Sequence, residues 1–442
     1  MKTLFPVILS LLVSSSILAQ HEHHLQGDHS LPIITKVAAQ PLIAQAVRIG
    51  EALDFVGSSL PRGVKAALET LTVETYSEES IREVQELLDP FCLAYVDINP
   101  ESRVKVMNGP AKPILMQEGW TTYLIKVHNQ ANITAKLVAE SPNAEPILHR
   151  STSDHRMRAG NEISPGSLDN RFVEMTIYEG RPLSSRLSGL PVQYFLLQFY
   201  TRELGQREVK LGFNVGQGSQ DIGFRNTIDI LFHIRKAVKV YFEVLDENDL
   251  PAMASFTITD GVDRFQDQEG IDYRARRARS AHWMERQEKK EFGLPAEMRL
   301  QGIYPLPARR LAAKNEYPDF FFQPQIYRTS GEYIFLPPGE YHINYGRGPE
   351  YLEKYQSLIV PDDLDSMAIT FELDRWIHMA NLGWYSADHH IHASGCSHYE
   401  SPEEGVRPED MWRQVLGEDL NMGNNLTWGP SWYHQKKYFS GE

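Results

Sequence analysis

The chain lacks several features that would place it in common classes. Beyond the first 19 residues there is no run of about 18 apolar residues, so no membrane-spanning helix is expected in the mature chain. Only two cysteines occur, Cys92 and Cys396, in different predicted modules, which is a poor basis for a disulfide. Neither the nucleophile elbow of a serine hydrolase nor a phosphate-cradling glycine loop is present.

Positive charge is also scarce. The 44 Lys and Arg residues are outnumbered by 58 Asp and Glu residues, and the net charge of −14 argues against nucleic acid or an anionic membrane surface as the main partner. A hydrophobic fraction of 42% and an aromatic fraction of 10% are typical of a globular protein.

The first 19 residues have the pattern of a secretory signal peptide. Lys2 supplies the positive end, Leu4–Leu18 is apolar, and Ile17-Leu18-Ala19 is an acceptable cleavage site. We therefore expect a secreted or periplasmic protein that is cut after Ala19. The alternative is an uncleaved anchor.

Residues 20–90 are predicted to form an N-terminal helical region. Helices are expected over Val37–Phe55 and Pro61–Leu71, and a third helix is expected to be capped by Ser77 and ended by Pro90. No chemistry is indicated in this region, so a packing or spacer role is expected.

Two β-sandwich modules are predicted next. Residues 91–235 contain short β-rich segments separated by Gly, Pro and Asn turns, as expected for an Ig-like sandwich. In residues 236–375, Val238–Leu245 is expected to pair with Pro251–Thr259. This module resembles the prealbumin-type, carboxypeptidase-regulatory-like sandwiches, and the segment 262–300 is expected to be an insert.

The strongest chemical signal lies in the segment Gly383-Trp384-Tyr385-Ser386-Ala387-Asp388-His389-His390-Ile391-His392. Because side chains alternate along a strand, Asp388, His390 and His392 are expected on one face. Two imidazoles beside a carboxylate that could orient one of them can begin a zinc or iron site. An ordinary polar strand end is the alternative, because 16 histidines make a single His-x-His pair a weak signal.

The sequence after this strand raises the metal hypothesis. A helix is predicted over Pro408–Leu416, with acidic residues in its first turn and Gly417 at its end. A second strand is predicted over Leu420–Thr427. This strand–helix–strand order is the unit of parallel α/β barrels, whose chemistry lies at the carboxyl ends of the strands.

The string from Gly383 to Tyr399 resembles the opening of a PHP (polymerase and histidinol phosphatase) domain, and in particular the carbaryl-hydrolase-like CehA/McbA family. The resemblance implies a distorted (β/α)7 barrel, with His390 and His392 as ligands of a divalent metal. Zinc is expected, with manganese or iron as alternatives. It also implies hydrolysis of a small ester, carbamate or phosphoester, with Asp388 and His398 as catalytic residues.

Two departures from the family pattern stand out. The second strand ends in Thr427-Trp428-Gly429 where a PHP domain has Thr-Asp-His with further ligands. The segment 380–442 is also far shorter than the roughly 200 residues that a barrel needs. We therefore expect an N-terminal portion of a longer enzyme or a truncated product, inactive alone.

The predicted fold is thus a mainly β multidomain protein with N-terminal helices. It has two β-sandwich modules, followed by the first βαβ unit of an incomplete PHP-type barrel. The alternative function is a non-catalytic exported module that binds glycan or protein and carries a vestigial PHP segment. Aromatic residues crowd 317–355, where they could form a saccharide platform or simply the core of a sandwich.

Overall fold

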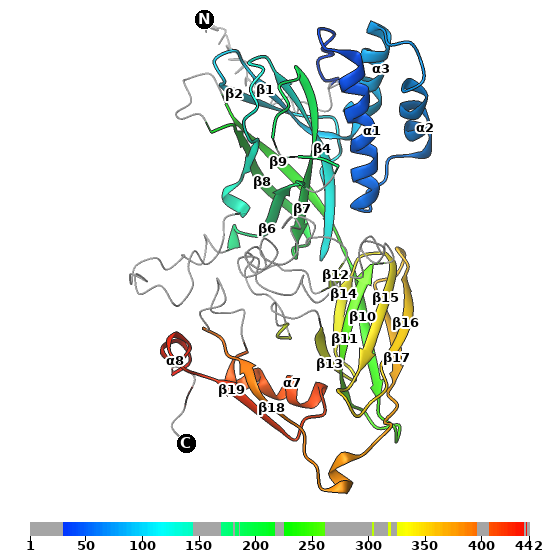
Figure 1. Cartoon of the computed structure of the whole chain (residues 1–442), viewed down its shortest axis with the longest axis vertical. Helices are drawn as coiled ribbons and strands as arrows, with labels where there is room; N and C mark the ends of the chain where they lie inside the picture. Colours follow the sequence, from blue (N-terminus) through cyan, green and yellow to red (C-terminus); the bar gives the residue numbers. More distant parts are fainter. Residues whose placement is uncertain are drawn as a thin grey trace, which may run out of the picture.

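The structure, a computed structural model, is mainly β, with helices at its N-terminal end and several sheets, as predicted (Figure 1). It describes residues 30–144, 169–179, 182–184, 186–216, 225–260, 303–304, 317–319, 325–395, 406–436 and 439. The expected signal peptide at 1–19, the expected insert at 262–300 and His398 lie outside the described residues.

Three helices precede the first strand. They are α1 (Ala39–Phe55), α2 (Arg62–Leu71) and α3 (Glu78–Leu88). Ser77 caps α3, because its Oγ accepts the N–H of Ser80 at 3.2 Å. Pro90 lies in the short 3-10 helix η1 (Asp89–Phe91) that follows α3. The three predicted helices and the predicted cap are therefore confirmed.

The first β region contains two sheets, with strand orders β2-β1-β4-β7-β6 and β3-β9-β8-β5. Their strands are β1 (Cys92–Ile98), β2 (Val104–Asn108), β3 (Ile114–Met116), β4 (Gly119–Asn129), β5 (Val138–Glu140), β6 (Val173–Ile177), β7 (Val192–Thr201), β8 (Gly205–Asn214) and β9 (Thr227–Arg235). Buried side chains of both sheets form one core, so the sheets face each other.

Strand β7 is buried along its whole length because it lies between two layers. Phe195, Leu197 and Phe199 join the core shared by the two sheets. Tyr194 and Leu196, on the other face, join the core formed with the helices. This region is therefore three layers deep, with the helices beside the sheet that contains β7 (Figure 1).

The second β region also contains two sheets, ordered β14-β10-β17 and β12-β11-β15-β16, with β13 pairing with β11. Their strands are β10 (Val238–Leu245), β11 (Met253–Asp260), β12 (Ile303–Tyr304), β13 (Ile326–Thr329), β14 (Tyr333–Leu336), β15 (Gly339–Gly346), β16 (Lys354–Val360) and β17 (Ser366–Glu372). Phe242, Phe256 and Phe371 meet in the core, with ring centroids 4.7 to 5.1 Å apart.

The predicted pairing of Val238–Leu245 with Pro251–Thr259 is wrong. Apart from one bridge between Leu245 and Pro251, β10 and β11 belong to different sheets. The reason is packing: Phe242 of β10 and Phe256 of β11 face each other across the core, 4.7 Å apart. The short turn between the strands therefore carries the chain from one sheet to the other.

The C-terminal unit begins after the 3-10 helix η4 (Met379–Leu382). Its elements are β18 (Ala387–His392), the 3-10 turn η6 (Pro408–Asp410), α7 (Met411–Gly417), β19 (Met422–Leu426) and α8 (Pro430–Gln435). Strands β18 and β19 are parallel. The unit lies beside β11 and β13 of the second β region (Figure 1).

Candidate functional site

Strand β18 holds His390 and His392 side by side. Their ring centroids are 5.1 Å apart and their planes are inclined by 27°. His390 is exposed and His392 is half-buried. Ile391, between them, points to the other face and is only 1% exposed. The predicted alternation is therefore confirmed for this pair of histidines.

Asp388 lies at an irregularity of the same strand. The register between β18 and β19 shifts between Asp388 and Ile391, so β18 contains an extra residue there. Oδ1 of Asp388 accepts the backbone N–H of His390 at 2.8 Å. The carboxylate thus holds the backbone that leads to the histidines, and its expected role in orienting an imidazole stays a prediction.

Helix α8 covers the carboxyl end of β18. Ser431 Oγ and Gln435 Nε2 both donate to the carbonyl oxygen of Ser394, at 3.0 and 2.9 Å. His434 lies against Gly395, where an added Cβ would be 2.5 Å from the Cβ of His434. His434 belongs to no motif that is recognisable in the sequence. Its place in a helix that directly follows the partner strand of β18 is the signal that could have identified it.

The imidazole pair alone does not make a metal site. Among the residues that the structure describes, no three His, Cys, Asp or Glu side chains form a group that could hold a metal ion. Catalytic zinc takes three protein ligands as a rule, and neutral imidazole suits zinc, iron and manganese to different degrees. His390 and His392 therefore fit as two ligands. His398 and Cys396 lie outside the described residues.

Glu418 is a second group that sequence reasoning missed. Burial raises its pKa, and the nearby charge of Asp388 raises it further, whereas hydrogen bonds from Tyr327 and Gln325 lower it. The Tyr327 hydroxyl donates to Oε1 of Glu418 at 2.9 Å. Glu418 precedes β19, so it lies at the amino ends of the two parallel strands, away from His392. In parallel barrels this end serves stability rather than chemistry.

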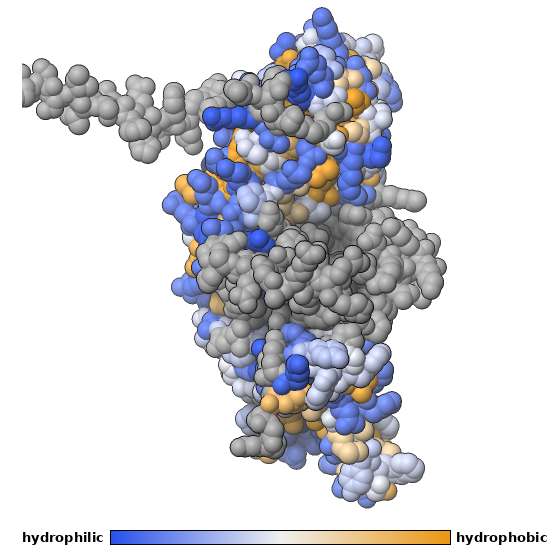
Figure 2. Space-filling model, turned by 90° about the vertical axis from the view of Figure 1, so that its left-hand side faces the viewer, coloured by the Kyte–Doolittle hydropathy of each residue, from blue (hydrophilic) through white to orange (hydrophobic). Residues whose placement is uncertain are grey.

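The C-terminal unit exposes several large apolar side chains. They include Leu416 at 44%, Met422 at 57% and Trp428 at 67% of full exposure. Figure 2 views the molecule from the side on which this unit lies. It shows hydrophobic residues at the surface of the lower part of the molecule. None of the helices in the described part of the chain has the length and apolar character needed to cross a bilayer.

Comparison with known proteins identifies no family. No protein-family model and no curated protein matches the chain. Among solved structures, the backbone protein of the group B streptococcus pilus 2b is similar over 60% of this chain and 96% of its own, at 9% identity and a TM-score of 0.18. BcpA, the major pilin subunit of Bacillus cereus, is similar over 64% of this chain and 67% of its own, at 11% identity and a TM-score of 0.18.

A third solved structure is the cysteine protease inhibitor EhICP2 from Entamoeba histolytica. It is similar over 32% of this chain and 95% of its own, at 12% identity and a TM-score of 0.15. Scores this low carry no argument about fold or function.

Proposed function

We propose that the protein is an exported, metal-dependent hydrolase related to the CehA/McbA branch of the PHP superfamily. In this proposal the two β regions are Ig-like and prealbumin-type sandwiches, and the unit from β18 onward begins a PHP-type barrel. The substrate is a small ester, carbamate or phosphoester. Export follows from the signal-like sequence that ends at Ala19.

One observation carries the proposal. Two imidazoles lie side by side at the carboxyl end of a strand that pairs in parallel with the next strand through a helix. In α/β barrels the carboxyl ends of the strands carry the chemistry, and imidazole is the commonest neutral ligand of zinc.

Each residue has a defined part in the proposed site. A divalent metal held at His390 and His392 would lower the pKa of a bound water to about 7 and would supply positive charge for the scissile carbonyl or phosphoryl group. His390 and His392 hold the metal, and Asp388 fixes the strand backbone that carries them through its bond to the N–H of His390. His398 is proposed as a group that polarises the substrate.

The test is metal binding by the full chain. We expect zinc to co-purify with the protein and to be lost from the double variant His390→Ala/His392→Ala. The control is His378→Ala/His389→Ala, which removes two other exposed histidines. Equal zinc content in the two double variants would contradict the proposal.

A second candidate function is saccharide binding by the second β region. An open cavity of about 190 Å³ lies on its surface and is lined by Ser255, Thr257, Asn344, Tyr345 and Glu353, among others. Hydroxyl, amide and carboxylate groups suit the hydroxyls of a sugar as hydrogen-bond partners. Binding on a glycan array that is lost in Asn344→Ala but kept in His390→Ala/His392→Ala, in a protein without zinc, would favour this function.

A further inference from the structure

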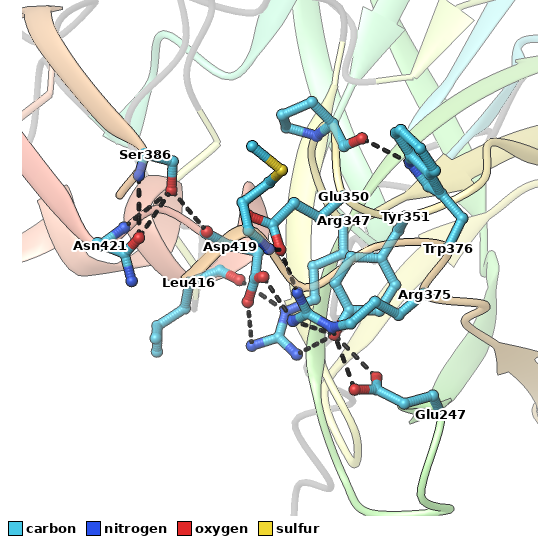
Figure 3. A network of polar contacts seen from close by, with 12 residues as sticks. Glu247, Arg347, Glu350, Tyr351, Arg375, Trp376, Ser386, Leu416, Asp419 and Asn421 are labelled. Atoms are coloured by element: carbon cyan, nitrogen blue, oxygen red, sulfur yellow. Dashed lines mark hydrogen bonds and ion pairs between the residues drawn. The ribbon is translucent and has the colours of Figure 1, made fainter. Parts of the chain in front are cut away.

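Arg375, directly after the second β region, joins that region to the C-terminal unit. Its side chain is 11% exposed, and its three nitrogens contact three carboxylates (Figure 3). Nε lies 3.1 Å from Glu247, Nη1 lies 2.7 Å from Glu350, and Nη2 lies 2.5 Å from Asp419. Glu247 and Glu350 belong to the second β region, whereas Asp419 lies between α7 and β19. The guanidinium therefore bridges the two parts of the chain.

A second arginine, Arg347, contacts the end of α7 and the turn that holds Asp419. Arg347 Nε donates to the carbonyl oxygen of Leu416 at 3.1 Å, and its Nη2 lies 3.4 Å from Asp419. A cation at the last carbonyls of α7 is favourable because these groups carry the negative end of the helix dipole. The hydroxyl of Tyr351 accepts from both Arg347 and Arg375, at 3.2 and 2.8 Å, and it donates to Glu247 at 2.9 Å.

The network continues to the start of the histidine strand. Ser386, just before β18, donates through Oγ to the carbonyl oxygen of Asp419 at 3.2 Å and through its N–H to Asn421 Oδ1 at 2.9 Å (Figure 3). Glu350 also accepts the N–H of Met379 at 3.3 Å, at the start of the segment that leads into β18. The amino ends of β18 and β19 are thus tied to each other and to the second β region.

Further contacts hold the C-terminal unit close to the second β region. Arg413 of α7 forms a two-pronged ion pair with Glu332, at 3.0 and 2.5 Å. Gly417, the last residue of α7, lies so close to Tyr327 that a Cβ there would be 2.1 Å from the ring. Ile391 of β18 joins a small buried cluster with Tyr327, Met253 and Val406.

We propose that Arg375 is a positioning residue that fixes the His390/His392 strand to the second β region. It acts on the amino ends of β18 and β19, at the opposite end of β18 from His392. The second β region is then part of the scaffold of the candidate site and not a separate appended module. The metal readout of this proposal rests on the proposed function, whereas the hydrogen-exchange readout does not.

The first readout is hydrogen exchange of the full chain, with Arg375→Met compared with the parent protein. We expect amides of β18, α7 and β19 to exchange at least 10-fold faster in the variant, because Asp419 loses its main partner. Amides of β10 and β11 should be unchanged. Lys354→Met is the matched control. It also removes a cation, but Lys354 pairs with the exposed Asp374, and both residues belong to the second β region. Its exchange should equal that of the parent.

The second readout is cobalt binding, followed by the visible absorption of the bound ion. Arg375→Met should weaken cobalt binding at least 5-fold, and Arg375→Lys should restore part of it, because lysine keeps the charge but not the three-way geometry. If the parent protein binds no cobalt, the proposed function fails and the hydrogen-exchange result still decides the role of Arg375.

A variant of Asp419, the partner of Arg375 in the C-terminal unit, tests the proposal independently in case Arg375→Met misfolds. Asp419→Asn leaves Arg375 paired with Glu247 and Glu350, and it should raise exchange in the same segments. The double variant Arg375→Met/Asp419→Asn should exchange more slowly than the sum of the two single effects predicts, because both changes break the contact between Arg375 and Asp419. Asp419→Asn also removes the charge that Arg347 faces at 3.4 Å, so its own effect need not vanish in the double variant. Unchanged protection of β18 and β19 in Arg375→Met and in Asp419→Asn would overturn the proposal.

Discussion

Lys126 is the clearest case of a single residue that links two layers of the fold. Its side chain has no exposed surface, and it lies in β4, a strand of the first β region. Nζ donates to Asp89 Oδ2 at 2.7 Å and to the carbonyl oxygen of Pro32 at 2.9 Å. Tyr194 donates to the other oxygen of Asp89 at 2.8 Å. Both buried charges are thus hydrogen-bonded.

Replacing Lys126 by Met should therefore cost stability. The change leaves the Asp89 carboxylate buried without its cation, and removal of one partner of a buried ion pair costs about 3–5 kcal/mol. Urea unfolding, followed by far-UV circular dichroism, measures the loss. The double variant Asp89→Asn/Lys126→Met should recover part of it, since no charge then stays buried. A loss below about 0.5 kcal/mol in Lys126→Met would contradict this account.

At the scale of elements, the residue that follows helix α7, Glu418, is an acid that folding makes harder to ionise. The folded state raises the pKa of Glu418, mainly by burial. A carboxyl with a raised pKa contributes stability that is complete below its unfolded pKa and is lost as the pH rises through the folded pKa. A carboxylate at a helix C-terminus also opposes the dipole. The contact of α7 with β13 should therefore be more stable in acid than at neutral pH.

Glu418→Gln tests this pH dependence. The amide oxygen can still accept the Tyr327 hydroxyl, but no charge forms as the pH rises. Hydrogen exchange of α7 is measured and corrected for its intrinsic pH dependence. At pH 7 the amides of α7 should be better protected in the variant than in the parent. Well below the usual Glu pKa, the two proteins should show the same protection. Glu340→Gln, at an exposed position of β15, is the control. If the protection of α7 in the parent protein increased from pH 4 to pH 7, the prediction would be contradicted.

The sequence predicts elements better than it predicts their partners. The Ser77 cap and the apolar spacing of α3 depend on near neighbours, and they were predicted correctly. The sheet assignment of β10 and β11 depends on which face of each strand meets the core, and the predicted pairing was wrong. Alternating apolar residues are compatible with a hairpin and with two facing sheets, so the pattern does not distinguish them.

The candidate site shows the same limit. Alternation along a strand was enough to place His390 beside His392. Arg375 contacts Glu247 and Asp419, which are 128 and 44 residues away in the chain, and no local pattern relates them. His434 reaches Gly395 through the fold in the same way. Contacts of this kind become visible only when the elements are assembled.

At the scale of the whole molecule, the buried residues divide into two groups. The helices and the first β region share strands β1, β4 and β7, whose two faces pack into adjacent cores. The second β region has its own core, with Phe242, Phe256 and Phe371 at its centre. The link between β9 and β10 is short, and Ala237 there donates its N–H to Gln117 Oε1 at 3.2 Å. We therefore expect two cooperative units.

Two core substitutions test this division in the full chain. Urea unfolding should proceed in two transitions, and Phe195→Ala should lower the midpoint of one while Phe256→Ala lowers the midpoint of the other. Each truncation removes a buried ring and should cost about 3–5 kcal/mol in its own unit. Hydrogen exchange at intermediate urea assigns each transition, and the C-terminal unit should follow the second β region because Arg375 and Arg413 tie them together. If either substitution shifted both transitions equally, the chain would unfold as one unit and the division would be wrong.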